Sequence, residues 1–183
     1  MKQAIGLVEL TNITRGILVA DTMLKAANVE LLLAQPLCPG KYVVMVSGDV
    51  GAVQSAVRSG KSAGGAENVV DEFVLSNIHP DVFQALSGCT EVKQIKSLGV
   101  IESYSVASAI VAADTAAKAA AVQILEVRLA RGMGGKAVVS VTGEIGAVTA
   151  AVRAGSNAIA HTGFLVDQLV IAAPHQGLHQ ALF

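Results

Sequence analysis

Aromatic and charged residues are both scarce in this chain. Only 3% of its 183 residues are aromatic, none is tryptophan and 15% are charged, whereas 52% are hydrophobic. A core without large rings must fill its volume with aliphatic side chains and closely approaching backbones. The 30 alanines and 18 glycines suit such packing. Because so little charge accompanies so much apolar surface, we expect the chain to cover part of that surface with copies of itself.

The net charge is also close to zero, long apolar runs are absent and cysteines are few. With 13 basic and 14 acidic residues the formal charge is −1, so nucleic acid is not an expected partner. Charged residues interrupt each apolar stretch before the roughly 18 residues of a membrane-spanning helix, and Glu9 interrupts the first one, which argues against a secretory signal. The two cysteines, Cys38 and Cys89, are too few for a disulfide framework and indicate a reducing cytoplasm.

The sequence contains two copies of one unit. The segment around Glu9 recurs around Glu102, at an offset of 93. Residues 48–60 match residues 143–155 at an offset of 95, with eight of thirteen positions identical. Nearly constant offsets of this kind are the signature of a tandem duplication. We predict a first domain at residues 1–88, a linker at 89–96 and a second domain at 97–183.

Hydrophobic periodicity predicts the same order of elements in each copy. In the first copy we expect strands at 4–10, 29–34, 42–47 and 69–75, helices at 16–27 and 49–63, and a short helix from Pro80. The first helix is expected to bury Ile17, Ala20, Leu24 and Ala27, and Asp49 is expected to cap the second. The resulting order β-α-β-β-α-β is the ferredoxin-like pattern, so the predicted fold class is α+β.

No familiar catalytic constellation is present, and we do not expect an enzyme. His79 and His175 occupy equivalent positions at an offset of 96, which favours a structural role repeated by duplication. The duplicated pairs Asp21 and Asp114, and Glu9 and Glu102, are interpreted as caps and polar contacts within the fold rather than as acid–base pairs.

Cys38 differs from these residues because the duplication did not copy it. Its counterpart at an offset of 95 is Met133, which lies in a glycine-rich turn. On the residues alone, a single cysteine between prolines is most often an incidental thiol, and Cys89 is interpreted in the same way.

Several motifs resemble the shell-protein domain of bacterial microcompartments. They are the Asp-Thr-Met-Leu-Lys-Ala-Ala block at 21–27, the Gly-Asp-Val-Gly-Ala-Val block at 48–53 and Ile-His-Pro at 78–80. Both copies match, which implies the tandem class of shell protein in the shell of a bacterial microcompartment. In that class a homotrimer imitates a hexagonal tile and meets other shell proteins. Lys25 and Lys118 match the family's edge lysine, whereas the family's edge arginine has no counterpart in either copy.

The turn Cys38-Pro39-Gly40-Lys41 is similar to that of the propanediol-utilisation type of tandem shell protein, which is associated with an iron–sulfur cluster. The resemblance implies one 4Fe–4S cluster per trimer, held by Cys38 from each of three chains. Pro39, Gly40, Met133 and Gly134 would then line the central pore. Such a cluster would relay electrons, or clusters, across the shell, with an enclosed redox enzyme as a candidate partner. Zinc is an open alternative as the metal.

Two other functions remain open at this point. The chain could form a metal-free tile whose pore conducts a metabolite, with Cys38 merely lining it. Alternatively, it could be a small regulatory protein that binds an effector and forms no sheets of tiles.

Overall fold

The computed structural model describes residues 4–86, 88 and 94–178. Cys89 and most of the predicted linker lie outside these residues. The described residues divide into two compact units: the first comprises residues 4–78 with Ser105–Ala107 and Ala130–Gly135, and the second comprises the other described residues. None of the described helices is both long enough and apolar enough to cross a membrane.

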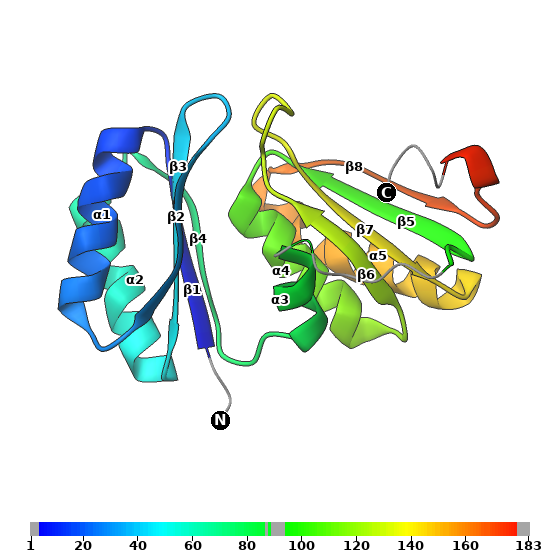
Figure 1. The fold of residues 1–183 in the computed structure, drawn as a ribbon, viewed down its shortest axis with the longest axis horizontal. Helices are drawn as coiled ribbons and strands as arrows, with labels where there is room; N and C mark the ends of the chain where they lie inside the picture. The colour runs from blue at the N-terminus through cyan, green and yellow to red at the C-terminus, as the bar shows by residue number, and fades with distance from the viewer. Residues whose placement is uncertain (1–3, 87, 89–93, 179–183) are drawn as a thin grey trace. The chain divides into compact units, whose positions relative to one another are not determined.

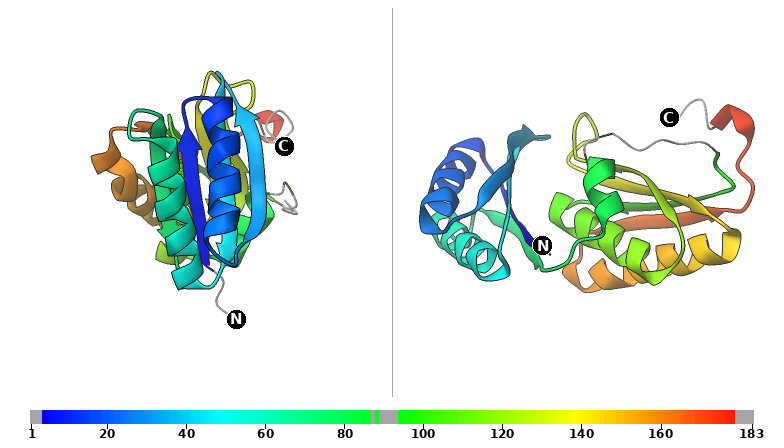
Figure 2. Two further views of the ribbon diagram at one scale, coloured as in Figure 1. Left: turned by 90° about the vertical axis from the view of Figure 1, so that its left-hand side faces the viewer. Right: turned by 60° about the horizontal axis from the view of Figure 1, so that its bottom comes forward.

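The first unit is a four-stranded antiparallel sheet with two helices on one face (Figure 1). The strands are β1 (Ala4–Leu10), β2 (Glu30–Leu37), β3 (Lys41–Gly48) and β4 (Val69–Leu75), in the spatial order β2-β3-β1-β4. The helices are α1 (Ile13–Ala26) and α2 (Val50–Gly64), which lie side by side across the sheet (Figure 2).

The second unit repeats this arrangement. Its strands are β5 (Ser97–Ser103), β6 (Gln123–Arg128), β7 (Ala137–Gly143) and β8 (Leu165–Ile171), in the order β6-β7-β5-β8. Its helices are α4 (Val106–Ala119) and α5 (Ile145–Ile159), followed by a 3-10 turn at Ala160–Thr162. The short helix α3 (Pro80–Leu86) packs against β6, so residues 80–86 belong to the second unit by packing and to the first copy by sequence.

The strand registers of the two sheets are equivalent. Glu9 of β1 lies opposite Val43 and Asp71, and Glu102 of β5 lies opposite Val138 and Asp167. Each first strand has a register shift directly after that glutamate. The predicted fold class, a duplicated β-α-β-β-α-β unit of α+β type, is therefore confirmed.

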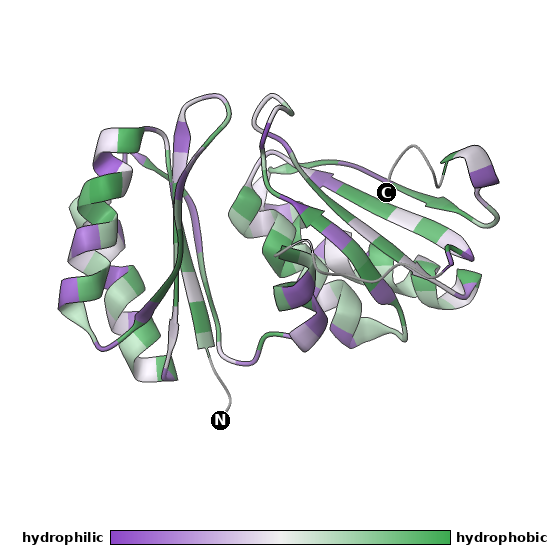
Figure 3. Cartoon of the chain, viewed as in Figure 1, coloured by the Kyte–Doolittle hydropathy of each residue, from purple (hydrophilic) through white to green (hydrophobic). Residues whose placement is uncertain are grey.

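The predicted inward face of α1 is only partly correct, because Ala20 and Ala27 pack against the core whereas Ile17 and Leu24 are exposed. The helix buries Gly16, Val19 and Met23, whereas Ile17 is 57% exposed and Leu24 is 41% exposed. The reason is steric: Gly16 lies against the ring of Tyr42, where a β-carbon would come within 2.3 Å, so the helix packs through its smallest residue. Strongly apolar stretches consequently remain along α1 (Figure 3).

The predicted role of Asp49 is only partly correct. Asp49 occupies the N-cap position of α2, but its side chain makes no capping hydrogen bond, and Glu144 behaves in the same way before α5. At the other end of α2, Gly65 has φ +79° and donates its N–H to Lys61 O, as expected for a glycine stop.

Glycine allows the helices to approach each other and the sheets closely. A β-carbon on Gly6 would lie 2.4 Å from Val57 Cγ2 of α2. In the second unit, a β-carbon on Gly155 of α5 would lie 2.7 Å from the carbonyl oxygen of Ala112 in α4. Close backbone approach therefore replaces the missing aromatic side chains in filling the core.

Gly155→Ala should lower the free energy of unfolding by about 1–3 kcal/mol, because the obstructing atom belongs to the backbone of α4 and cannot rotate away. Gly146→Ala, in the same helix but with no atom within 4 Å of the added carbon, is the matched control. It should be neutral or stabilising by up to about 1 kcal/mol. Thermal unfolding of both variants at one protein concentration measures the difference, and equal effects would contradict close α4–α5 packing.

Candidate functional site

Cys38 lies in the turn between β2 and β3, within the first unit. Its N–H donates to the carbonyl oxygen of Ala130 at 2.9 Å, and its Sγ accepts from the N–H of Gly132 at 3.4 Å. The thiol is partly buried, and the Cys38–Pro39 peptide bond is cis. Backbone hydrogen bonds on two sides therefore fix the position of the only cysteine within the described residues.

The partner of this turn is the glycine-rich segment Ala130–Gly135, which belongs to the same unit. Gly132, Gly134 and Gly135 have φ values of +71°, +60° and +84°, a region that favours glycine. A β-carbon on Gly135 would lie 2.9 Å from Pro39 Cδ. The structure thus brings the predicted pore residues Pro39, Gly40, Met133 and Gly134 into two adjacent turns, while their convergence on a symmetry axis stays a prediction.

A shallow depression of about 410 Å³ borders the thiol. Arg131 lies at its edge and its Nη2 donates to Gln35 Oε1. In the part of the chain that the structure describes, no group of three or more His, Cys, Asp or Glu side chains is placed to hold a metal. Among the described residues, a single chain therefore offers the Cys38 thiol at this position and no second side chain that would complete a metal site.

Each predicted edge lysine forms an ion pair with the duplicated aspartate four residues earlier. Lys25 Nζ lies 2.7 Å from Asp21 Oδ2, and Lys118 Nζ lies 2.5 Å from Asp114 Oδ2. Asp114 also accepts the N–H of His79 at 2.7 Å. These aspartates are contacts within the fold, as expected, but they lie inside their helices and are not caps. The placement of the lysines at a tile edge stays a prediction.

The two equivalent histidines have the same local role. His79 Nδ1 accepts the N–H of Asp81 at 3.3 Å, and His175 Nδ1 accepts the N–H of Gly177 at 3.1 Å. Each ring therefore stabilises the turn that follows it, which agrees with the predicted structural duty.

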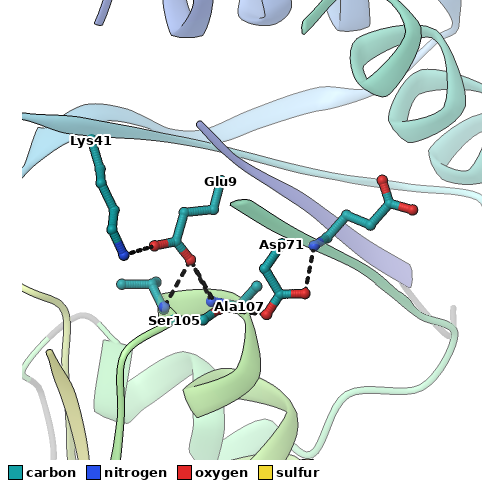
Figure 4. Close-up of polar contacts among 7 residues, drawn as sticks. Glu9, Lys41, Asp71, Ser105 and Ala107 are labelled. Carbon is teal, nitrogen blue, oxygen red and sulfur yellow. Dashed lines mark hydrogen bonds and ion pairs between the residues drawn. The ribbon is translucent and has the colours of Figure 1, made fainter. Parts of the chain in front are cut away.

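Glu9, interpreted from the sequence as a cap or a polar contact within the fold, accepts from a helix start and organises a larger network (Figure 4). Glu9 is fully buried, and its Oε2 accepts from Ser105 Oγ at 3.0 Å, Val106 N–H at 2.8 Å and Ala107 N–H at 3.2 Å. Its Oε1 accepts from Lys41 Nζ at 2.9 Å. The carboxylate therefore satisfies N–H groups at the start of α4 that have no partner within the helix.

Asp71 belongs to the same network because its Oδ2 lies 2.5 Å from Ser105 Oγ. The acidic and basic members all recur: Glu9, Lys41 and Asp71 correspond to Glu102, Lys136 and Asp167. In the second unit Lys136 Nζ lies 2.6 Å from Glu102 Oε1, and this hydrogen bond and charge raise the pKa of Lys136. The offsets of 93, 95 and 96 in the sequence were the available signal for this network.

These features together define a duplicated shell-type α+β domain, and sequence comparison agrees. The BMC domain model matches residues 4–78 and again residues 97–174. The chain therefore belongs to the BMC-domain family of bacterial microcompartment shell proteins, a structural class rather than a catalytic one.

The individual relatives support this assignment over nearly the whole chain. The chain is 44% identical to the microcompartment shell protein PduT of Citrobacter freundii, over 97% of this chain and 96% of that protein. A solved microcompartment protein from Desulfitobacterium hafniense is 50% identical, with a TM-score of 0.86 over 98% of this chain and 99% of that chain. The shell protein PduA of Citrobacter freundii is 39% identical and matches 46% of this chain over 92% of its own length.

Glu9→Gln should lower the free energy of unfolding by about 2–3 kcal/mol, because the neutral amide accepts less strongly from the helix start and removes the negative charge that lies beside Lys41. Glu144→Gln removes an exposed ion pair with Lys96 at 2.5 Å and serves as the control. Its expected effect is below about 1 kcal/mol. Denaturant unfolding at fixed protein concentration compares the two, and similar losses would contradict the anchoring role of Glu9.

Proposed function

We propose that this shell protein assembles as a homotrimeric tile and that the three Cys38 thiolates hold one 4Fe–4S cluster at the central pore. The tile would lie among other shell proteins of a bacterial microcompartment. The cluster would relay electrons, or be passed on as a cluster, to a redox enzyme inside the shell. The observation that carries the proposal is the Cys38 turn, in which backbone hydrogen bonds hold both the N–H and the Sγ of the cysteine.

The tandem domain composition supports a trimer. PduA of Citrobacter freundii matches less than half of this chain over almost its own full length, so one chain corresponds to two single-domain proteins. Three chains then supply six domains, the number that closes a hexagonal tile. Near-zero net charge favours the close meeting of like tiles, because little long-range repulsion opposes it.

The donor set supports a shared cluster rather than a site within one chain. Iron–sulfur clusters are held by cysteine thiolates, ordinarily four for each 4Fe–4S cluster. One chain contributes only Cys38 here, because Met133 stands at the equivalent place in the second copy. Three chains would supply three thiolates, and the remaining iron would take solvent, a small molecule or a group from a partner.

The contacts of the thiol suit an anionic sulfur. Gly132 donates its N–H to Cys38 Sγ, and hydrogen bonds to cluster sulfurs stabilise negative charge and tune the reduction potential. Gly135 has no β-carbon, so its segment can lie against Cys38 and Pro39 without steric conflict. These residues would position the thiolate and limit access of water to one side of it.

Anaerobic reconstitution tests the proposal. The wild-type chain should bind roughly four iron atoms and four sulfides for every three chains and should give an EPR signal on reduction. Cys38→Ser should lose this binding, because it removes the only proposed ligand, while the trimer stays intact by native mass spectrometry.

Cys89→Ser is the matched control, because it removes the chain's other cysteine and should bind as the wild type does. Undiminished binding by Cys38→Ser would overturn Cys38 as the ligand. A colourless wild-type trimer with an open pore would overturn the cluster and favour the metabolite-conducting tile. A chain that stays monomeric at every concentration would overturn the tile itself.

A further inference from the structure

The second unit repeats the charged residues of the Glu9 network but differs in what lies over the glutamate. Glu102, Lys136 and Asp167 stand where Glu9, Lys41 and Asp71 stand in the first unit, with the same strand register. Glu9 is fully buried beneath Ser105, Val106 and Ala107, whereas the side chain of Glu102 is 27% exposed. Within the described residues, no helix start donates to Glu102 as the start of α4 donates to Glu9.

An open depression lies over Glu102 in the second unit. Its volume is about 250 Å³, and Val100, Glu102, Val138, Asp167, Gln168 and Leu169 line it. Leu169 is 44% exposed. The depression therefore combines two carboxylates with an apolar border, which is the chemistry that suits an amphipathic helix start.

The matching helix start is present elsewhere in the chain. Asn12, Ile13 and Thr14 are equivalent to Ser105, Val106 and Ala107, because α1 begins four residues after Glu9 and α4 begins four residues after Glu102. The side chain of Asn12 accepts the N–H of Arg15 at 2.9 Å. The N–H groups of Ile13 and Thr14 come before it in the first turn, where a helix offers no internal acceptor.

The apolar surface next to this helix start is also uncovered. Ile13 is 42% exposed and Ile17 is 57% exposed. Their equivalents in α4, Val106 and Ile110, are fully buried. The same helix face is thus covered in one copy of the repeat and exposed in the other.

We propose that the start of α1 from a second copy of this chain docks into the Glu102 depression, with the Glu102 carboxylate accepting the N–H groups of Ile13 and Thr14. The carboxylates of Glu102 and Asp167 complement the partial positive charge of the helix start. The exposed Ile13 and Ile17 would pack toward the apolar border that includes Leu169.

This contact joins unlike surfaces and so runs head to tail. Each copy then donates one helix start and accepts another, and such contacts form either closed rings or open filaments. The inference rests on the proposed trimer for the number of copies, and it assigns the residues that hold one copy to the next.

Glu102→Ala tests the contact in the full chain. We expect the dissociation constant for assembly to rise roughly 30-fold or more, because the variant leaves desolvated N–H groups without their charged acceptor. Glu144→Ala removes another carboxylate that is ion-paired to a lysine and should leave assembly unchanged. Sedimentation velocity over a range of concentrations measures assembly, and circular dichroism verifies that each variant is folded.

Hydrogen–deuterium exchange supplies a second measurement that locates the contact. In the assembled wild type the amides of Ile13 and Thr14 should exchange slowly, and in Glu102→Ala they should exchange rapidly. The amides of Val106 and Ala107, bound to Glu9 within each chain, should stay protected in both proteins.

The outcomes separate this inference from the proposed tile. A trimer that persists in Glu102→Ala with unchanged protection of Ile13 and Thr14 would overturn the contact and leave the tile standing. Rapid exchange of these amides in the wild-type trimer would overturn the contact as well. A wild-type chain that never assembles would overturn the proposed tile and this contact together.

Discussion

A fully buried carboxylate organises the first unit. Glu9 lies on a central strand, where an uncompensated charge would carry a large desolvation cost. Its acceptors are engaged by Lys41, Ser105 and the first N–H groups of α4. Because this network joins a strand of the first copy to a helix start of the second, it ties together segments that lie 96 or more residues apart. The compact unit therefore contains residues from both copies of the repeat.

The duplication placed equivalent residues in both copies, and a few substitutions gave the two copies different roles. Met133 occupies the position in the second copy that is equivalent to Cys38, so only the first copy carries a thiol in its turn. The glycines at 132, 134 and 135 belong to the second copy, and their positive φ values let that turn lie against Cys38 and Pro39. A thiol from one copy and a tight turn from the other make one local structure. Neither copy contains this structure by itself.

The sequence was sufficient for features that depend on neighbouring residues and insufficient for those that depend on packing. Strand and helix order followed from periodicity, and the roles of His79 and His175 followed from their equivalence. The inward face of α1 followed only in part, because the contact between Gly16 and the ring of Tyr42, 26 residues apart in the sequence, determines how the helix packs. The Glu9 network was missed for the same reason: duplicated acidic and basic positions indicate a shared role, but they do not reveal which helix start fills it.

The scarcity of aromatic and charged residues follows from the same architecture. The close approach of neighbouring elements at Gly6, Gly60 and Gly155 leaves little room in the core for rings other than those of Tyr42 and Phe73. Larger aliphatic side chains such as Ile13, Ile17 and Leu24 then remain outside, and an exposed apolar face of this kind is stable in water only where another surface covers it. In the proposed ring the Glu102 depression of the next copy covers Ile13 and Ile17. The scarcity of aromatic and charged residues is thus linked both to the tight packing within each unit and to the need of each chain for a neighbour.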